Sequence, residues 1–259
     1  MVSQIGYQLV ESANSMGMGG ASIALQGVQA IYDNPAGLVG TTRSCALLAT
    51  ELKFGLKGLT PMSLAYVTPT QSSVFGFSFQ NYTYDSFREN KLMVAYARRL
   101  TAKFNLGIHL DYLHLKVDEY GSKNLLTFGI GCNTWIFNNL VLSAYVYNPV
   151  SAKLNQDERT PSVFRLGLGY TINEKVLISV ETEKNIYFAP SFKFGLSYQA
   201  AESLALRCGF RSSPNIFSFG LAYKINKNFT TDLALSNHAY LGMTPALSFN
   251  YSLGKEKGE

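Results

Sequence analysis

The sequence predicts an all-β protein, a 14-stranded antiparallel transmembrane β-barrel plugged by its own N-terminal segment. Three observations predict this fold. Apolar and polar residues alternate along most of the chain, tyrosines recur at one end of the alternating stretches, and charged residues make up only 15% of the 259 residues, against roughly 25% in soluble domains. The chain has no apolar run of the roughly 18 residues that a membrane-spanning helix needs. A closed barrel is the other form that pairs every backbone group in lipid.

The N-terminal segment, residues 1–42, does not share the alternation. A fourteen-stranded barrel is too wide to be filled by its own wall side chains, so we expect this segment to fold into the lumen as a hatch. Asn34 before Pro35 predicts a helix N-cap followed by proline at the first helical position, and Gly37 is expected to end that turn. The glycine-rich residues 17–20 lack the Lys-Ser/Thr ending of a phosphate-binding loop.

The predicted barrel, residues 43–254, repeats one unit: a stretch of period-two alternation followed by a turn. Ile178 and Val180, for example, share one face of their stretch, whereas Ser179 and Glu181 share the other. Fourteen such stretches are centred near residues 47, 64, 77, 95, 109, 129, 143, 166, 179, 195, 207, 219, 232 and 249. An even number of strands is usual for single-chain bacterial barrels.

The polar face of these stretches is rich in glycine, which fits either strong strand curvature or the close approach of a segment inside the barrel. The glycines concerned are Gly76, Gly107, Gly129, Gly131, Gly167, Gly169, Gly195, Gly209 and Gly220.

Turn lengths orient the predicted barrel in a bacterial outer membrane. With the N-terminus in the periplasm, the first strand runs outward, and the turns after even strands lie in the periplasm. These turns are all short: Pro69-Thr70, Leu100-Thr101, Asn138-Asn139, Asn173-Glu174, Ala201-Glu202 and Asn226-Lys227. The longer connections, including Tyr82–Arg88 and Asn148–Thr160, then lie outside, which is the usual asymmetry of such barrels.

Tyrosines on the apolar face indicate where the barrel meets the membrane surface. Six of them lie near the C-terminal ends of even strands: Tyr66, Tyr96, Tyr170, Tyr198, Tyr223 and Tyr251. A tyrosine ring is apolar while its hydroxyl reaches water, so one level of tyrosines predicts an aromatic girdle. A soluble β-sandwich, the alternative for an alternating chain, has no reason to align tyrosines at one height.

Charged residues on the lumen face can be interpreted in two ways. They are a polar permeation path or, as we favour, a paired network that holds the hatch. The residues of this polar network are Arg165, Glu181, Glu183, Lys193, Arg207 and Asp232. His109 and Asp111 also share the lumen face, and we interpret them as a hydrogen-bonded pair because two ligands alone do not make a metal site.

Other functions are disfavoured by the sequence. The net charge is +5, but the basic residues form no cluster interleaved with aromatics, so we expect no nucleic-acid binding. Cys45, Cys132 and Cys208 have neither a zinc-binding nor a disulfide spacing. No serine is paired with a histidine and an acid at a recognisable spacing, so we expect neither enzymatic activity nor a cofactor. Residues 255–259 form a polar C-terminal tail.

A resemblance adds to this reading. The motif of the N-terminal segment consists of Met18, Gly19, Gly20 and Ala21, followed by Asn34, Pro35, Ala36, Gly37 and Leu38. It resembles the N-terminal signature of the FadL-related outer-membrane barrels, and within them most closely the PorV/PorQ-like proteins of Bacteroidetes. The Phe164–Gly167 stretch with Tyr170, and Leu241-Gly242, are also similar to that group. Asn14 replaces an arginine that is common in the family, which puts any salt bridge of that arginine in doubt.

The resemblance implies two functions. FadL-like barrels are passive transporters of hydrophobic small molecules, and a lipid or detergent tail in the lumen fits that function. PorV/PorQ-like barrels are partner subunits in type IX protein secretion and surface attachment. Because the outer loops look short and polar, we expect an accessory subunit of an envelope protein complex, for secretion, surface-protein export or outer-membrane assembly, embedded in outer-membrane lipid. Transport is the alternative.

Overall fold

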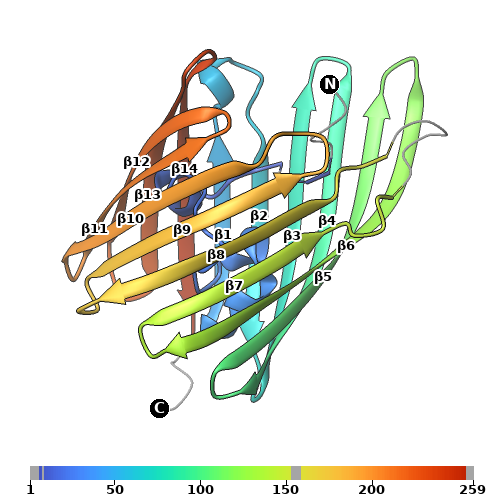
Figure 1. The fold of residues 1–259 in the computed structure, drawn as a ribbon. Coiled ribbons are helices and arrows are strands. Elements are labelled where there is room, and N and C mark those ends of the chain that lie inside the picture. The colour runs from blue at the N-terminus through green and yellow to red at the C-terminus, as the bar shows by residue number, and fades with distance from the viewer. Residues whose placement is uncertain (1–5, 8, 153–158, 255–259) are drawn as a thin grey trace.

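A computed structural model shows a closed antiparallel barrel of fourteen strands (Figure 1). It describes residues 6–7, 9–152 and 159–254, so the predicted tail at 255–259 lies outside the described residues. The strands are β1 Ser44–Glu51, β2 Met62–Pro69, β3 Ser73–Tyr84, β4 Phe87–Thr101, β5 Phe104–Val117, β6 Gly121–Phe137, β7 Leu140–Tyr147, β8 Val163–Ile172, β9 Val176–Asn185, β10 Ser191–Ala201, β11 Leu204–Ser212, β12 Asn215–Lys224, β13 Phe229–His238 and β14 Gly242–Leu253.

The strand count and the all-β class predicted from the alternation are confirmed, and each predicted centre falls within its strand. Each strand pairs with its sequence neighbours, and β1 closes the barrel by pairing with β14, where Leu48 faces Phe249. Closure leaves no unpaired sheet edge, which is what a sheet needs in order to cross a lipid bilayer.

The outer surface of the barrel is apolar and open to its surroundings. Large side chains such as Phe192, which is 65% exposed, and Phe219, which is 67% exposed, point outward, while their strand neighbours Lys193 and Ser218 point inward and are buried. An apolar band of this extent would be unfavourable in water and suits lipid. The chain is a multi-pass barrel of the bacterial outer-membrane type.

The two rims of the barrel differ, though not only in loop length. At one rim, here called the short-turn rim, the six connections after even strands span two to four residues, as predicted. At the opposite rim, 148–162 is indeed the longest connection. The expectation of a long connection at Tyr82–Arg88 is wrong, because Tyr84 pairs with Phe87 across a two-residue turn. The hydrogen-bonded ladder between β3 and β4 continues beyond the apolar band of the barrel, because the backbone groups of polar residues pair equally well in water.

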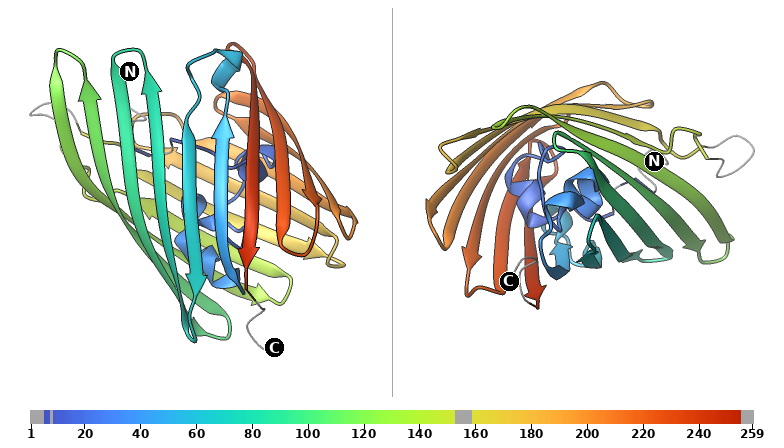
Figure 2. Two further views of the ribbon diagram at one scale, coloured as in Figure 1. Left: turned by 180° about the vertical axis from the view of Figure 1, so that it is seen from behind. Right: turned by 90° about the horizontal axis from the view of Figure 1, so that it is seen from below.

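One side of the wall is consequently taller than the other (Figures 1 and 2). Strands β3 to β6 have 12, 15, 14 and 17 residues, whereas β7 has only 8. Between β1 and β2, the short 3-10 helix η2, Lys53–Gly55, lies at the same rim as the tall hairpins.

The described part of the N-terminal segment lies inside the barrel (Figure 2). It forms helix α1 Ala13–Gly17, helix α2 Ala30–Asp33 and the 3-10 helix η1 Pro35–Gly40. Ser12 caps α1 by accepting a hydrogen bond from the Ser15 N–H. Asn34 caps η1 as expected, but η1 continues past Gly37 to Gly40. No helix of the described residues is long and apolar enough to cross a membrane.

The N-terminal segment traverses the whole lumen. Its end at Thr42 is at the short-turn rim, where β1 starts. Its first described residues are near the opposite rim, where the Gly6 N–H donates to Glu89 Oε1 at 2.7 Å. The first strand therefore begins at the short-turn rim, as the predicted orientation requires, whereas the first described residues lie near the other rim.

Candidate functional site: the filled lumen

The N-terminal segment contacts the wall at glycines of the strands. A Cβ atom on Gly209 would lie 2.1 Å from the backbone carbon of Met18, and one on Gly107 would lie 2.3 Å from the backbone nitrogen of Ala36. Of the nine glycines singled out above, eight lie against this segment, and Gly129 instead lies against His109. Close approach to a segment inside the barrel is thus the reason for most of these glycines.

All residues of the N-terminal motif are buried inside the barrel. Asn34 makes three contacts: its Nδ2 donates to the Ile23 carbonyl at 3.1 Å and to Asn133 Oδ1 at 2.9 Å, and its Oδ1 accepts from the Ala36 N–H at 3.1 Å. One side chain thereby joins two turns of the segment to strand β6. It fits there because Gly131, beside it, has no side chain.

We expect Asn34→Ala to lower the free energy of unfolding by about 1–3 kcal/mol, because it leaves buried partners of the amide without a hydrogen bond. Urea unfolding of the barrel in lipid vesicles would measure the change. Asn81→Ala is the matched control, since Asn81 also donates to an asparagine, Asn90, but in a half-buried position. A loss at Asn34 no larger than that at Asn81 would contradict the assigned role.

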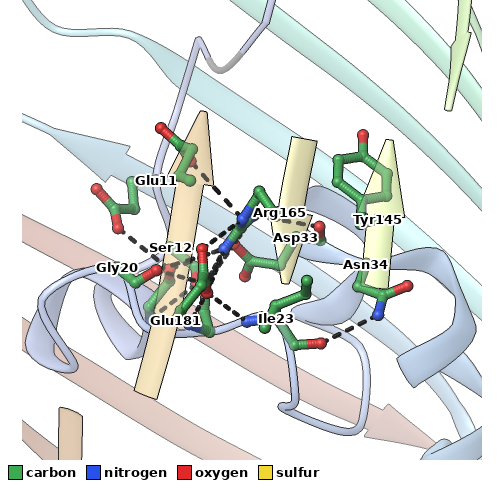
Figure 3. Close-up of polar contacts among 12 residues, drawn as sticks. Glu11, Ser12, Gly20, Ile23, Asp33, Asn34, Tyr145, Arg165 and Glu181 are labelled. Atoms are coloured by element: carbon green, nitrogen blue, oxygen red, sulfur yellow. Dashed lines mark hydrogen bonds and ion pairs between the residues drawn. The ribbon is translucent and has the colours of Figure 1, made fainter. Parts of the chain in front are cut away.

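Four residues of the predicted polar network, Arg165, Glu181, Glu183 and Lys193, form one ion cluster in the lumen. Figure 3 shows Arg165 and Glu181 of this cluster. Arg165 Nε lies 2.6 Å from Glu181 Oε1, and Lys193 Nζ lies 2.9 Å from the same oxygen. Lys193 also contacts Glu183 Oε2 at 2.8 Å. Register brings them together, because Glu181 faces Lys193 and Glu183 faces Arg165 on neighbouring strands.

The ion cluster binds the N-terminal segment directly. The Arg165 guanidinium donates to the carbonyls of Asp33 and Gly20, at 3.2 and 3.3 Å, and Glu181 Oε2 accepts from the backbone N–H groups of Ser22 and Ile23 at 3.1 and 3.0 Å. Buried charges are tolerated only when paired and fully hydrogen-bonded. The N-terminal segment therefore completes the cluster, and the cluster holds the segment.

Sequence reasoning missed the acidic residues that the N-terminal segment brings to this cluster. Asp33 lies 3.5 Å from Arg165 and accepts a hydrogen bond from the Ser22 hydroxyl at 2.6 Å. Glu11 lies 3.5 Å from Arg211. The segment has no periodicity that would have indicated which of its side chains face the wall.

Arg207 and Asp232 do not join this cluster, contrary to the predicted common network. They form a separate pair at 2.6 Å. In the sheet register Lys193 faces Arg211, whereas Arg207 faces Ser197. Four residues along a strand correspond to roughly 13 Å, so Arg207 lies much nearer the short-turn rim than the cluster.

A second polar group holds the beginning of the N-terminal segment. His109 Nδ1 lies 2.8 Å from Asp111 Oδ1, as interpreted from sequence, and Asp111 Oδ2 also pairs with Lys91 Nζ at 2.9 Å. Lys91 Nζ donates to the Gly6 carbonyl at 3.1 Å, and the Tyr147 hydroxyl donates to the same carbonyl at 2.6 Å. Among the described residues no group of three or more His, Cys, Asp or Glu side chains is placed to hold a metal ion.

A pocket of about 310 Å³ lies between the N-terminal segment and the wall near the short-turn rim. Apolar side chains contribute much of its lining: Met18, Ala24, Leu25, Trp135, Val141 and Leu177. Carboxamides of Asn14, Gln26 and Gln29 supply polar groups on the side of the N-terminal segment. Segment and wall are therefore not in full contact here.

The predicted girdle tyrosines lie on the outer face, near the ends of even strands. Five of them are 40–47% exposed, and Tyr96 is partly covered, with its ring 5.2 Å from that of Phe75 and its hydroxyl 2.9 Å from Ser73 Oγ. Their role at the membrane surface stays a prediction.

Fold and lumen together define a class of protein: an outer-membrane barrel of fourteen strands with its N-terminal segment inside. No protein-family model matches the sequence, and a search of curated proteins finds no relative.

Solved structures do match. The toluene transporter TbuX of Ralstonia pickettii has a TM-score of 0.77 at 12% identity, over 94% of this chain and 98% of that one. The monoaromatic hydrocarbon channel CymD has a TM-score of 0.76 at 12% identity, over 98% and 100%. A FadL homologue of Pseudomonas aeruginosa has a TM-score of 0.72 at 10% identity, over 95% and 99%. At these identities the likeness is one of fold, and it is the fold of FadL-type barrels.

These neighbours overturn the expected accessory role. They are transporters and channels, not enzymes or secretion subunits, and they correspond to the transport alternative. The expectation failed because outer loop length was taken as the measure of a capture site. In this barrel apolar side chains lie on the lumen side of the wall instead: near the outer ends of β5 and β6, Leu113, Leu115 and Leu125 form a buried cluster with Phe87.

Proposed function

We propose that the protein is a passive outer-membrane transporter of small hydrophobic molecules. The observation that carries the proposal is the pocket between the N-terminal segment and the wall, within a barrel whose fold is shared with hydrocarbon channels. Its volume of about 310 Å³ lies at the lower end of the roughly 300–1,000 Å³ range of small-molecule sites. The finer placement, within the PorV/PorQ-like group, stays a prediction on which transport does not depend.

Uneven attachment of the N-terminal segment supports a gate in one part of it. Residues 17–23 lie against wall glycines and the ion cluster, and residues 34–36 lie against β5 and β6. Between them, Ala24, Leu25 and Gln29 line the pocket, and Gly27 has a φ of 107° that favours glycine. We infer that residues 25–27 move to let a solute pass, while Ala24 stays against Gly169 and Val28 stays in the buried cluster that it forms with the wall.

The pocket defines the part of the path that lies near the short-turn rim. There it offers Trp135, Val141 and Leu177. An apolar solute loses no hydrogen bonds on leaving water for this surface, so burial favours its entry.

Ser197→Trp is expected to reduce uptake of toluene strongly, because an indole placed on β10 would fill the pocket that Ser197 lines. The assay is uptake of radiolabelled toluene by metabolically inactive cells whose own hydrophobic-solute channels have been deleted. Whole cells are needed because toluene crosses simple phospholipid vesicles without a protein.

Phe194→Trp is the matched control, since Phe194 is on the same strand but faces outward. Wild-type protein that gives no uptake above cells without it would refute transport. Equal uptake by the wild type and by Ser197→Trp would refute this path.

A further inference from the structure

The net charge of the protein is concentrated at the short-turn rim. Cationic residues there occur just before β1, near the ends of β4 and β12, and on the β4–β5, β8–β9 and β12–β13 connections: Arg43, Arg98, Arg99, Lys103, Lys175, Lys224 and Lys227. Among the described residues, the acidic ones at this rim are Glu174 and Glu202. Within the described ranges none of these seven cations makes an ion pair with a carboxylate, in contrast to the buried cations of the lumen.

The opposite rim is different. There, cations and acids are mixed, and Lys53 pairs with Glu51 at 3.5 Å and Lys116 with Asp118 at 3.4 Å. Arg88 and Lys123 at this rim are in no ion pair among the described residues, but the turns beside them carry Asp85, Asp118 and Glu119. The excess of cations over acids is thus found at the short-turn rim.

The cations lie next to the tyrosines of the outer face. Arg98 follows Tyr96 by two residues and so points to the same, lipid-facing side, roughly 7 Å further along β4. Lys224 directly follows Tyr223 at the end of β12. The phosphate groups of a bilayer lie just beyond its hydrocarbon core, which is the level that these cations reach when the tyrosines are at the edge of that core.

We propose that the cationic short-turn rim binds the phosphate groups of anionic glycerophospholipids around the barrel. Charge complementarity argues for an anionic partner. The distribution of the cations argues for lipid and against a docked protein, because they are spread over separate turns around the rim and do not form one patch. Long Lys and Arg side chains suit this position, since their stems cover apolar surface while their heads reach the phosphates.

Native mass spectrometry of the full chain, released from micelles containing equal amounts of phosphatidylglycerol and phosphatidylcholine, tests the proposal. The wild type is expected to retain phosphatidylglycerol preferentially, by roughly fivefold per contacted cation. The triple variant Arg98→Gln, Arg99→Gln, Lys103→Gln is expected to lose much of this preference. The matched control Arg88→Gln, Lys116→Gln, Lys123→Gln removes three cations at the other rim and is expected to retain it.

Equal retention of the two lipids by the wild type would overturn the proposal, as would an equal loss in the control variant. A third arm contains lipopolysaccharide, and a preference for it that the rim variant abolishes would assign the rim to a different lipid and overturn the proposal as well. If the rim variant does not fold, the same measurement is made on the wild type at two salt concentrations. Raising the salt concentration from about 0.05 M to 0.5 M must abolish a preference for phosphatidylglycerol that is electrostatic.

Discussion

Arg165→Met is expected to release the N-terminal segment from the wall and to open the lumen to ions. The guanidinium makes five hydrogen bonds within about 3.3 Å, to Glu181 twice, to the Asp33 and Gly20 carbonyls and to the Ser22 hydroxyl. Without it, Glu181 and Asp33 remain buried with only part of their partners. Breaking a buried ion pair from one side costs about 3–5 kcal/mol.

Two measurements check this expectation. Urea unfolding in vesicles should show the loss of stability, and planar-bilayer recordings should show a rise from a closed baseline to a steady conductance. Lys116→Met is the control, because Lys116 is in an exposed ion pair of a kind that contributes about 0–1 kcal/mol. A variant at Arg165 that unfolds like the control and stays closed would show that the ion cluster does not hold the segment.

Gly209→Val is expected to displace the N-terminal segment without preventing barrel formation. Even the first carbon of the new side chain would overlap the backbone of Met18 and Gly19, at 2.1 and 2.2 Å. Backbone on both sides of the contact leaves no flexible side chain to move aside. The strand itself tolerates valine well, so the expected product is a barrel whose segment is no longer packed inside.

Limited proteolysis is the direct readout, because cleavage within residues 9–42 should become fast while the wall stays resistant. Cys208→Val places the same side chain at the neighbouring position on the lipid-facing side, where it does not touch the segment, and should leave proteolysis unchanged. Slow cleavage in both variants would mean that the contact at Gly209 is not needed to keep the segment inside.

Alternation was sufficient to predict the strands because every wall residue faces either lipid or the lumen. It could not predict where β3 ends and where β4 begins. Beyond the membrane both faces meet water, so polar residues such as Asn81 and Asn90 continue the ladder although they resemble a loop in the sequence.

The site was predicted less completely. The residues that the strands contribute to the ion cluster could be predicted from the alternation of apolar and polar residues. Asp33 and Glu11 could not be predicted, because the N-terminal segment has no repeating pattern. Its contact with Arg165 also joins residues more than a hundred positions apart in the sequence. The depth of each side chain along the barrel axis was also mispredicted. Whether Arg207 lies level with Lys193 depends on the register between β10 and β11, and in that register the two residues are four positions apart.

The path of the N-terminal segment has a consequence for how the barrel is assembled. An even number of strands ordinarily returns both chain ends to the same side of a membrane, yet Gly6 lies near one rim and Leu253 near the other. Threading residues 6–42 through a finished barrel is avoided when the seam between β1 and β14 closes around a segment that is already in place. We therefore expect the pairing of the first and last strands to be the final step of biogenesis.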